Sequence, residues 1–415
     1  MPNSVYLSAM RDLPDQDVFE PIVRGITQSG VRLANERAVL SLIAGIPGVS
    51  NADIARRSGL GPQTTARILA ELEARDLIIR GEVLRGRRGQ PATPYHLNPL
   101  GGFSLGVEIG WRHAEVLLQN IAGQPVAVTR RCHQYPHPDT IFAEVAADIE
   151  TLLSGLPNEH RARLAGIGLS TPGNFGPLLS HLGAPDCVID DWATLEIGPR
   201  LASETDLPVL WVNDGSAAAW LEIMAFPAPR PKGIASFFVG TFISGGVVSE
   251  GSLVEGPYGN AADLGAIVVH DRTGQPAYLH LTASLHAMVL KAIDAGYPAL
   301  TGSPRKWDWD GMASVVSTWL DDAGHALAQA ILTTTAMTEV DIVTLNGDLP
   351  DTILSRLVQA TSNHLERFPV LLAHRPRLTT GLGGPSSTAL GAAQLLLFRR
   401  HFSRAWDLFD PEQDK

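Results

Sequence analysis

The chain is poor in cysteine and has no long hydrophobic run. These two shortages argue against a disulfide-stabilised protein and against a membrane-spanning protein. Its 415 residues include two cysteines, Cys132 and Cys187, which are too few for a disulfide framework or a structural zinc site. No apolar stretch is long enough to span a membrane. Residues 1–20 lack the basic segment and the following apolar segment of a secretory signal. We therefore expect a cytoplasmic protein with no metal site and no membrane partner.

Basic residues are also scarce, and their distribution is uneven. The net charge is −11, with 45% hydrophobic and 18% charged residues, which indicates a globular chain of two or three domains. Residues 1–100 contain twelve Arg or Lys and ten Asp or Glu, a net charge of +2, so the remainder carries −13. A basic module joined to an acidic body is compatible with DNA binding by that module alone.

A basic, glycine-containing segment lies near the end of this module. Residues 85–91 read Arg-Gly-Arg-Arg-Gly-Gln-Pro. Glycine allows close backbone approach, and guanidinium groups are attracted to phosphates and to the narrow minor groove. A solvated loop between two domains is the alternative, but the position directly after a helix-turn-helix pattern favours DNA. The residues of this segment that we assign to DNA are Arg85, Arg87, Arg88 and Gln90.

The preceding residues predict a winged helix-turn-helix. A capping box at Ser50 and Asp53 favours a helix start, and Pro62 suits the first turn of the next helix. The expected helices are residues 32–45, about 51–58 and about 62–75, and the expected wing strands are residues 77–79 and 83–84.

The third of these helices would be the one that reaches base edges. Its apolar positions, Ile68, Leu69 and Leu72, recur at helical spacing and are expected to face inward. The residues expected to face the DNA groove are Gln63, Thr64 and Arg67. A helical hairpin used only for protein contacts is the alternative, and Arg56 and Arg57 would contact phosphates or be solvated.

From residue 103 onward, the pattern becomes one of buried strands alternating with helices. Expected strands at residues 164–172, 208–212, 234–239 and 340–345 each run into a turn with glycine or polar residues. This alternation predicts an α/β body, and ligands bind at the carboxyl ends of strands in such sheets.

Seven short motifs in this order resemble the ROK family (repressors, open reading frames and kinases) over roughly residues 30–400. The motifs are RGRRGQP, LGVEIG, GIGLSTPG, PVLWVNDGSAAAWLE, GTFISGG, GNAADLGA and LGAA. The resemblance implies an α/β fold in which a winged helix-turn-helix precedes two actin-like ATPase (ribonuclease H-like) lobes. The expected domains are an extension at 1–30, a DNA-binding domain at 31–98 and a body at 99–415, whose lobes cover about 99–215 plus the C-terminal helix and about 216–395.

The resemblance also places a sugar-binding cleft at the Asn-Asp pair. Asp214 matches the family's catalytic base, and Asn213 matches a neighbouring sugar contact. A carboxylate accepts hydrogen bonds from sugar hydroxyls whether or not ATP is present. The structural alternative for Asp214 is an Asx turn that caps the helix starting at Gly215.

Both glycine-rich phosphate turns depart from the kinase pattern of the family. Trp111 and Arg112 replace the second glycine and the threonine of Asp-x-Gly-Gly-Thr, and Phe242 replaces the middle glycine of Gly-Thr-Gly-x-Gly. Such turns bind phosphate through backbone N–H groups, and bulky rings there oppose ATP binding. We expect no kinase activity, no catalytic residue and no cofactor; Asp214 would be the base if the chain were a kinase.

The zinc-binding residues usual in the family are absent from the sequence. Ala266 stands in place of a histidine ligand, and residues 270–284 contain no cysteine. His270, His280 and His286 could replace the missing ligands, but core or solvated histidines are the favoured interpretation. We expect no metal.

The sugar contacts that the resemblance implies are partly changed. Asp263 stands where the family has a glutamate, and Asp186 falls about where an asparagine contacts the sugar. The full expected ligand set is Gly173, Asp186, Asn213, Asp214 and Asp263. A body that binds no ligand and serves only as a scaffold is the alternative.

These features predict a DNA-binding transcriptional regulator, a repressor of carbohydrate genes. Its expected partners are double-stranded operator DNA, a sugar or sugar-derivative effector, and further copies of itself in a homodimer or homotetramer. The alternative is an active kinase that phosphorylates a hexose or amino sugar with ATP and carries an appended DNA-binding domain.

Overall fold

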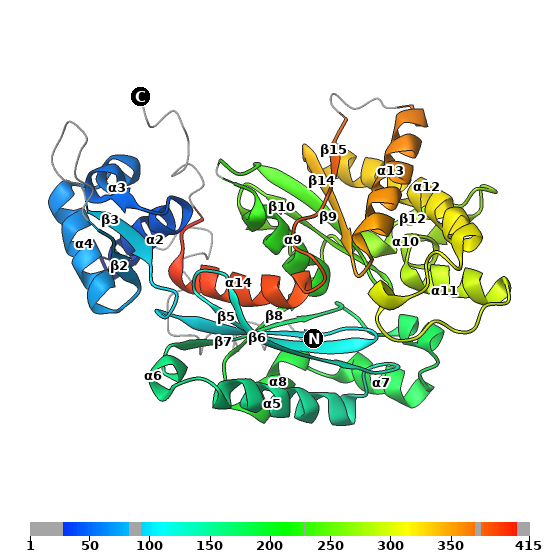
Figure 1. Cartoon of the computed structure of the whole chain (residues 1–415), viewed down its shortest axis with the longest axis horizontal. Helices are drawn as coiled ribbons and strands as arrows, with labels where there is room; N and C mark the ends of the chain where they lie inside the picture. The colour runs from blue at the N-terminus through cyan, green and yellow to red at the C-terminus, as the bar shows by residue number, and fades with distance from the viewer. Residues whose placement is uncertain (1–27, 83–92, 228, 370–374, 405–415) are drawn as a thin grey trace.

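The computed structural model describes residues 28–82, 93–227, 229–369 and 375–404. They form a small N-terminal head, whose described residues lie between 28 and 97, and a larger body of two lobes (Figure 1). The elements of the head are α2 (Gln28–Gly45), β1 (Val49–Ser50), α3 (Asn51–Ser58), α4 (Pro62–Ala74), β2 (Ile78–Arg80) and β3 (Pro94–Leu97).

Local capping explains the helices of the head. The Asp53 backbone N–H donates to Ser50 Oγ at 3.2 Å at the start of α3, and Gly59 ends this helix in the left-handed region with φ 68°. The apolar residues expected to face inward are buried. β2 pairs antiparallel with β3, whereas the wing strand expected at residues 83–84 lies outside the described residues.

Lobe 1 is built on a five-stranded sheet of order β6-β5-β4-β7-β8. Helices α5 and α8 cover one face of this sheet, and α14 covers the other (Figure 1). The elements of lobe 1 are β4 (Phe103–Ile109), β5 (His113–Asn120), β6 (Pro125–Cys132), α5 (Pro138–Ser154), α6 (Asn158–Arg161), β7 (Leu164–Thr171), η1 (Pro177–Leu182), α7 (Asp186–Thr194), α8 (Ile197–Thr205), β8 (Val209–Asn213) and α14 (Ser387–His401).

Glycines allow α14 to lie directly on the lobe 1 sheet. A Cβ at Gly106 in β4 would collide with the Ala389 carbonyl, and one at Gly168 in β7 would collide with the Ala392 carbonyl. The helix can therefore pack this closely on the sheet only because these positions in the strands and in α14 carry small residues.

Lobe 2 has a five-stranded sheet of order β11-β10-β9-β14-β15. Helix α9 packs on one face, and α12 contributes to the apolar core on the other (Figure 1). Its elements are α9 (Asp214–Ala225), β9 (Gly233–Val239), β10 (Ile243–Ser249), β11 (Ser252–Leu253), η2 (Leu264–Ala266), β12 (Val268–His270), β13 (Pro276–Tyr278), α10 (Leu279–Thr282), α11 (Leu285–Asp294), η3 (Pro304–Lys306), α12 (Ala313–Thr338), β14 (Ile342–Gly347), α13 (Asp351–Arg367) and β15 (Arg377–Thr380).

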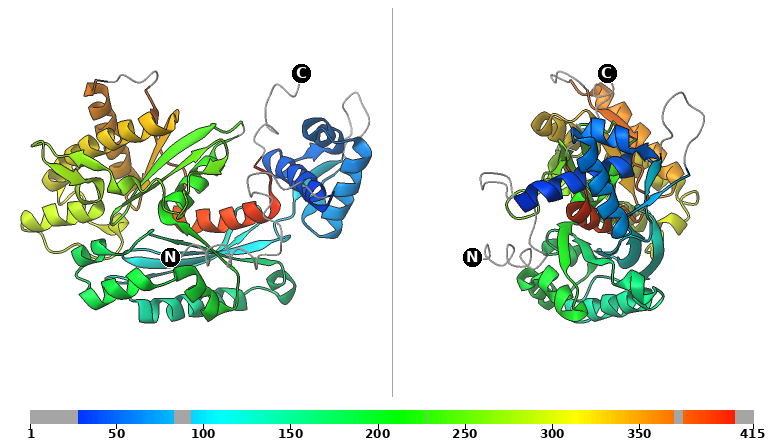
Figure 2. Two further views of the ribbon diagram at one scale, coloured as in Figure 1. Left: turned by 180° about the vertical axis from the view of Figure 1, so that it is seen from behind. Right: turned by 90° about the vertical axis from the view of Figure 1, so that its left-hand side faces the viewer.

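Helix α14 connects the junction of the lobes to the head, as the left view of Figure 2 shows. At its C-terminal end, the Arg400 carbonyl accepts a hydrogen bond from Arg37 Nη2 at 3.2 Å. The Ser403 backbone N–H donates to Ser41 Oγ at 2.8 Å, and Phe398 joins the same apolar cluster as the core of the head. Among the described residues, no helix combines the length and apolar character needed to cross a membrane.

Candidate ligand cleft and DNA-binding head

Two adjoining cavities lie where the lobes meet. The larger cavity, of about 490 Å³, is lined by the β4–β5 turn and β6 of lobe 1 and by the β9–β10 turn and α11 of lobe 2. The smaller cavity, of about 50 Å³, lies at the carboxyl end of β8. Trp111 and Asp214 line both cavities. We call the two cavities together the cleft.

The two aromatic residues that replace turn glycines contact each other across the cleft. Trp111 follows β4 in lobe 1 and Phe242 precedes β10 in lobe 2, and their ring centroids lie 4.9 Å apart at an interplanar angle of 83°. Trp111 also makes an edge contact with Phe175 at 5.1 Å. Both replacing rings are buried. The rings therefore fill the space between the two turns and join the lobes.

Asp214 is a buried carboxyl group with a strongly altered pKa. It is the first residue of α9, and its Oδ1 accepts a hydrogen bond from the Gly215 backbone N–H at 2.7 Å. Burial, followed by the negative charges of Glu108 and Asp263, raises the pKa of Asp214 to about 7. Near neutral pH the ionised form of this group can accept a hydrogen bond from a ligand hydroxyl, and the protonated form can donate one to it.

Asn213 lines the smaller cavity, caps the N-terminus of α9 and forms a hydrogen bond with Asn260. Its Oδ1 accepts from the backbone N–H groups of Gly215 at 2.9 Å and of Ser216 at 3.3 Å. Its Nδ2 donates to Asn260 Oδ1 at 2.9 Å. A Cβ at Gly173 would collide with the Asn260 amide, so the absence of a side chain at Gly173 allows Asn260 to reach this position.

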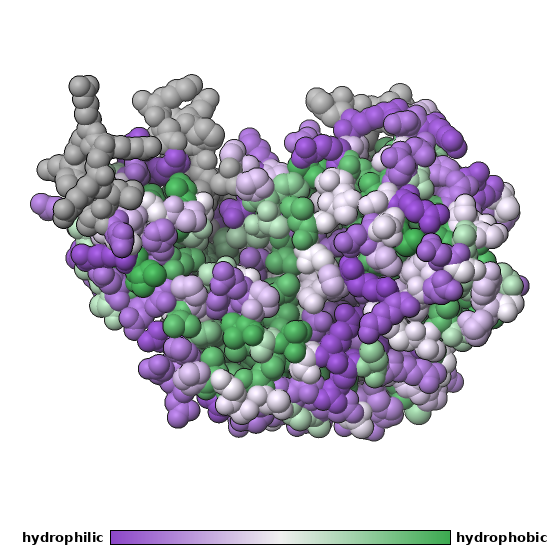
Figure 3. Space-filling view, viewed as in Figure 1, coloured by the Kyte–Doolittle hydropathy of each residue, from purple (hydrophilic) through white to green (hydrophobic). Residues whose placement is uncertain are grey.

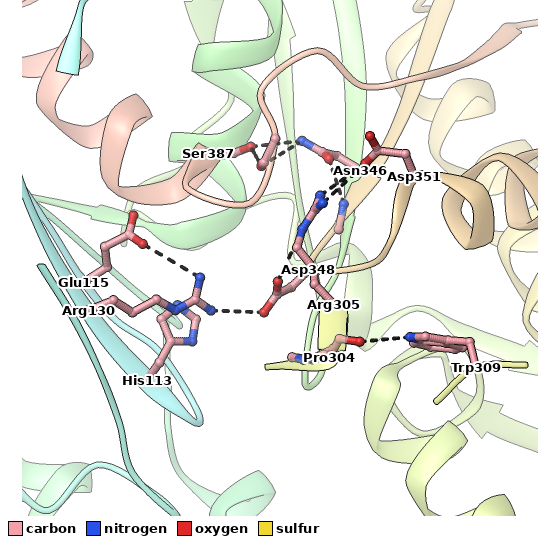
Figure 4. Close-up of polar contacts among 12 residues, drawn as sticks. His113, Glu115, Arg130, Pro304, Arg305, Trp309, Asn346, Asp348, Asp351 and Ser387 are labelled. Atoms are coloured by element: carbon pink, nitrogen blue, oxygen red, sulfur yellow. Dashed lines mark hydrogen bonds and ion pairs between the residues drawn. The ribbon is translucent and has the colours of Figure 1, made fainter. Parts of the chain in front are cut away.

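Two buried carboxylates, Glu115 and Asp348, and two partly exposed arginines, Arg130 and Arg305, also connect the lobes (Figure 4). Arg130 lies in β6 of lobe 1, and Asp348 directly follows β14 of lobe 2. Arg130 Nη2 lies 3.0 Å from Asp348 Oδ2, and Arg130 Nη1 lies 3.8 Å from Glu115 Oε2. Arg305 Nε lies 3.9 Å from the other oxygen of Asp348. Burial, followed by the charge of Glu108, raises the pKa of Glu115. The position of Arg130 is thus set by carboxylates from both lobes.

The head presents polar residues on the first turns of α4. Gln63 and Arg67 are exposed, and Thr64 is half-buried. Arg67 Nη1 lies 2.6 Å from Glu71 Oε1 one turn later. The assigned residues of the basic segment, namely Arg85, Arg87, Arg88 and Gln90, lie outside the described residues, so their contacts with DNA stay a prediction.

Comparison with known families identifies the two parts. The model of the ROK family matches residues 104–398. The chain belongs to the ROK family. The model of the MarR family matches residues 29–89, which agrees with the winged helix-turn-helix of the head. The expected combination of a winged-helix domain and an actin-like ROK body is therefore confirmed.

Relatives of this ROK chain include both regulators and kinases. It is 28% identical to the uncharacterized protein y4fQ of Sinorhizobium fredii, over 89% of this chain and 92% of that protein. It is 22% identical to the xylose repressor of Bacillus subtilis, over 58% of this chain and 62% of that protein. It is 27% identical to the N-acetylmannosamine kinase of Escherichia coli O157:H7, over 69% of this chain and 98% of that protein.

Two solved structures show the same fold as this ROK chain. A ROK family transcriptional regulator, described as a homologue of the E. coli MLC protein, superposes with a TM-score of 0.65 at 20% identity, over 91% of this chain and 98% of the other. A ROK family glucokinase from Streptomyces griseus superposes with a TM-score of 0.57 at 18% identity, over 71% of this chain and 99% of the other.

Within the ROK body, the structure brings four of the five expected ligand residues together. Gly173, Asn213, Asp214 and Asp263 line the smaller cavity. Asp186 does not join them, because it is the exposed first residue of α7 and lines neither part of the cleft. Its expected role rested on sequence order, which does not fix the direction of a side chain on the first turn of a helix.

Sequence reasoning missed two side chains of this ROK site. Asn260 lies in the GNAADLGA motif, which signalled the family but pointed to no role for this residue. His280 was expected at most as a zinc ligand, yet it lines the smaller cavity with its Nε2 3.6 Å from Asp263 Oδ1. Within the part of the chain that the structure describes, no group of three or more His, Cys, Asp or Glu residues is placed to hold a metal ion.

Proposed function

We propose that this ROK chain is a DNA-binding transcriptional regulator, a repressor of carbohydrate genes, whose cleft binds a sugar or sugar derivative without phosphorylating it. The observation that carries the proposal is helix α14, which runs from the cleft to the DNA-binding head. The names of two similar proteins, a xylose repressor and a ROK transcriptional regulator, support the same function.

Helix α14 is in contact with the cleft at its N-terminal end. Thr388 lines the larger cavity, and Ser387 Oγ accepts a hydrogen bond from Asn346 Nδ2 of β14 at 2.9 Å (Figure 4). The helix has 15 residues, which at 1.5 Å per residue gives a length of about 22 Å. A movement of lobe 2 relative to lobe 1 would therefore be transmitted as a displacement of α14.

The other end of α14 is tied to the head through Arg37 and Ser41 of α2. A displaced α14 would change the orientation of α2 and of the adjoining recognition helix α4. Two heads in a dimer must match the spacing of two DNA half-sites, so a small change in orientation alters DNA affinity. The ligand acts by binding one lobe arrangement more tightly than the other.

The cleft favours ligand binding over phosphoryl transfer. The rings of Trp111 and Phe242 fill the space between the two phosphate turns, where a kinase needs backbone N–H groups directed at phosphate. In contrast, Asp214, Asn213 and Asp263 line the smaller cavity and offer the hydrogen-bonding groups that a polyol requires.

A sugar kinase is the second candidate, and the pKa of Asp214 favours it. A carboxyl group with a pKa of about 7 is suited to accept a hydroxyl proton at neutral pH, and several similar proteins are named as kinases. In a coupled assay of ATP turnover over a panel of hexoses and amino sugars, our proposal predicts no sugar-dependent turnover. Turnover that the Asp214→Asn variant abolishes would establish the kinase instead.

The regulatory role is tested with DNA from upstream of the chain's own gene. Fluorescence anisotropy should detect binding that unlabelled specific DNA displaces and unrelated DNA of equal length does not. Equal displacement by both DNAs, in a folded protein, would contradict sequence-specific DNA binding.

A further inference from the structure

A second cavity lies between the head and the body, remote from the cleft. It has a volume of about 210 Å³, and Figure 3 shows the surface hollowed between these two parts. Ser41 and Ala44 of α2 line it from the head, Gln119 and Ile121 from the β5–β6 region, and Gln394 from α14. A molecule in this cavity would contact all three parts at once.

Gln119 is the unusual residue of this cavity. Its side chain is 1% exposed, yet neither Nε2 nor Oε1 has a hydrogen-bond partner among the described residues. Gln394 Oε1 is likewise buried without a partner there. Buried polar groups in folded proteins are normally paired, and an unpaired amide is costly. Leu117, two residues earlier in β5 and so on the same face of the sheet as Gln119, packs against Ala389 and Ala393 of α14, so this face accepts apolar side chains and strand formation does not need the amide.

The lining defines the chemistry of a fitting ligand. Gln119 Nε2 needs an acceptor, and the Oε1 atoms of Gln119 and Gln394 each need a donor. A hydroxyl group can act as a donor or as an acceptor. Leu397 and Phe398 of α14 provide an apolar wall. Arg230 also lines the cavity and has an interaction of its own, and a hydroxyl oxygen is an acceptor that its N–H groups can also use. The amides of Gln119 and Gln394 carry no charge, so a neutral ligand with several hydroxyl groups matches the unpaired amide groups. The volume lies below the range of about 300–1,000 Å³ typical of drug-sized ligands.

We propose that this cavity is a second small-molecule site, which binds a small uncharged polyol between the head and the body. Its hydroxyl groups pair with the amides of Gln119 and Gln394, and its carbon chain packs on the wall from α14. Because the ligand contacts α2 and α14 together, binding stabilises one placement of the head on the body. The consequence for DNA affinity rests on the proposed regulatory function, whereas the binding itself does not.

Calorimetric titration of the full chain with glycerol, erythritol, xylitol and sorbitol tests the site. Concentrations stay below those at which polyols stabilise proteins generally by exclusion from the surface. We expect saturable binding of at least one polyol. The Gln119→Leu variant should weaken it at least about tenfold, the loss expected when the amide hydrogen bonds are removed. Gln275→Leu is the matched control, because Gln275 is exposed and does not line this cavity, and it should leave binding unchanged.

A second variant fills the cavity without touching Gln119. Ala44 is exposed and lines the cavity from the head, so Ala44→Phe should also reduce binding while the chain remains folded by circular dichroism. The absence of saturable binding for all four polyols would overturn the proposal. So would unchanged binding in both Gln119→Leu and Ala44→Phe, or binding that Asp214→Asn abolishes and Gln119→Leu does not, because the ligand would then occupy the cleft.

Discussion

The contact between Trp111 and Phe242 makes a quantitative prediction about stability. Phe242 is 2% exposed, and its ring lies 4.9 Å from Trp111 and 5.3 Å from His286 between centroids. Phe242→Ala removes a fully buried ring at the junction of the lobes. We expect it to lower the free energy of unfolding by about 3–5 kcal/mol, of which the ring–ring interaction with Trp111 accounts for about 0.5–1.5 kcal/mol.

Urea unfolding followed by circular dichroism measures this decrease. Phe242→Leu is the matched control, since it keeps most of the apolar volume, and it should cost less than about 1.5 kcal/mol. A double-mutant cycle with Trp111→Ala isolates the ring–ring interaction, because a direct interaction makes the two decreases non-additive. A decrease below about 1 kcal/mol for Phe242→Ala, or strictly additive decreases in the cycle, would refute the claim that these rings join the lobes.

Three further predictions concern the basic segment, the buried carboxyl group and the inter-lobe charges. Arg87→Ala combined with Arg88→Ala should weaken DNA binding and flatten its dependence on salt, by about 0.9 in the logarithmic slope for each DNA phosphate that is no longer neutralised; an unchanged slope in anisotropy titrations would contradict the assignment. Because burial raises the pKa of Asp214 from 3.8 in the unfolded chain to about 7, its contribution favours the folded state at acid pH and is lost as pH rises through about 7. Thermal unfolding should therefore show a smaller decrease of stability between pH 4 and pH 7 for Asp214→Asn than for the wild type, and equal decreases would count against the raised pKa. Arg130→Ala removes the cation that lies between Glu115 and Asp348, but Arg305 stays 3.9 Å from Asp348 Oδ1 and Arg130 is itself partly exposed, so the expected cost in urea unfolding is about 1–3 kcal/mol; a cost near zero would show that the inter-lobe charges do not hold the lobes together.

The head was predictable because its signals are local. The capping box at Ser50 and Asp53 and the proline at position 62 lie within a few residues of the helix starts that they specify, and α3 spans Asn51–Ser58 as expected. The buried strands of the body were also predictable from continuous apolar runs that end in polar turns. Periodicity and capping act over single turns of chain, so one sequence suffices to recognise them.

The cleft was predictable only in part, because its interactions join distant segments. Asn213 and Asn260 are 47 residues apart, and Arg130 and Asp348 are 218 apart. The sequence placed bulky rings in both phosphate turns, but their mutual contact across the lobes depends on how the two sheets pack. Likewise, the exposed position of Asp186 depends on the orientation of α7, which no local pattern specifies.

The central claim is that a ligand in the cleft controls the DNA-binding head through α14. Its most direct test measures the DNA affinity of the wild type and of the Asp214→Asn variant, with and without sugars. Fluorescence anisotropy over a sugar panel should find a sugar that changes the affinity of the wild type about 5–150-fold, the range of typical coupling between sites. Asp214→Asn should bind DNA equally well without sugar and show no response. A wild type whose specific DNA binding no sugar alters, or a folded Asp214→Asn variant whose sugar-free DNA affinity collapses, would contradict the account.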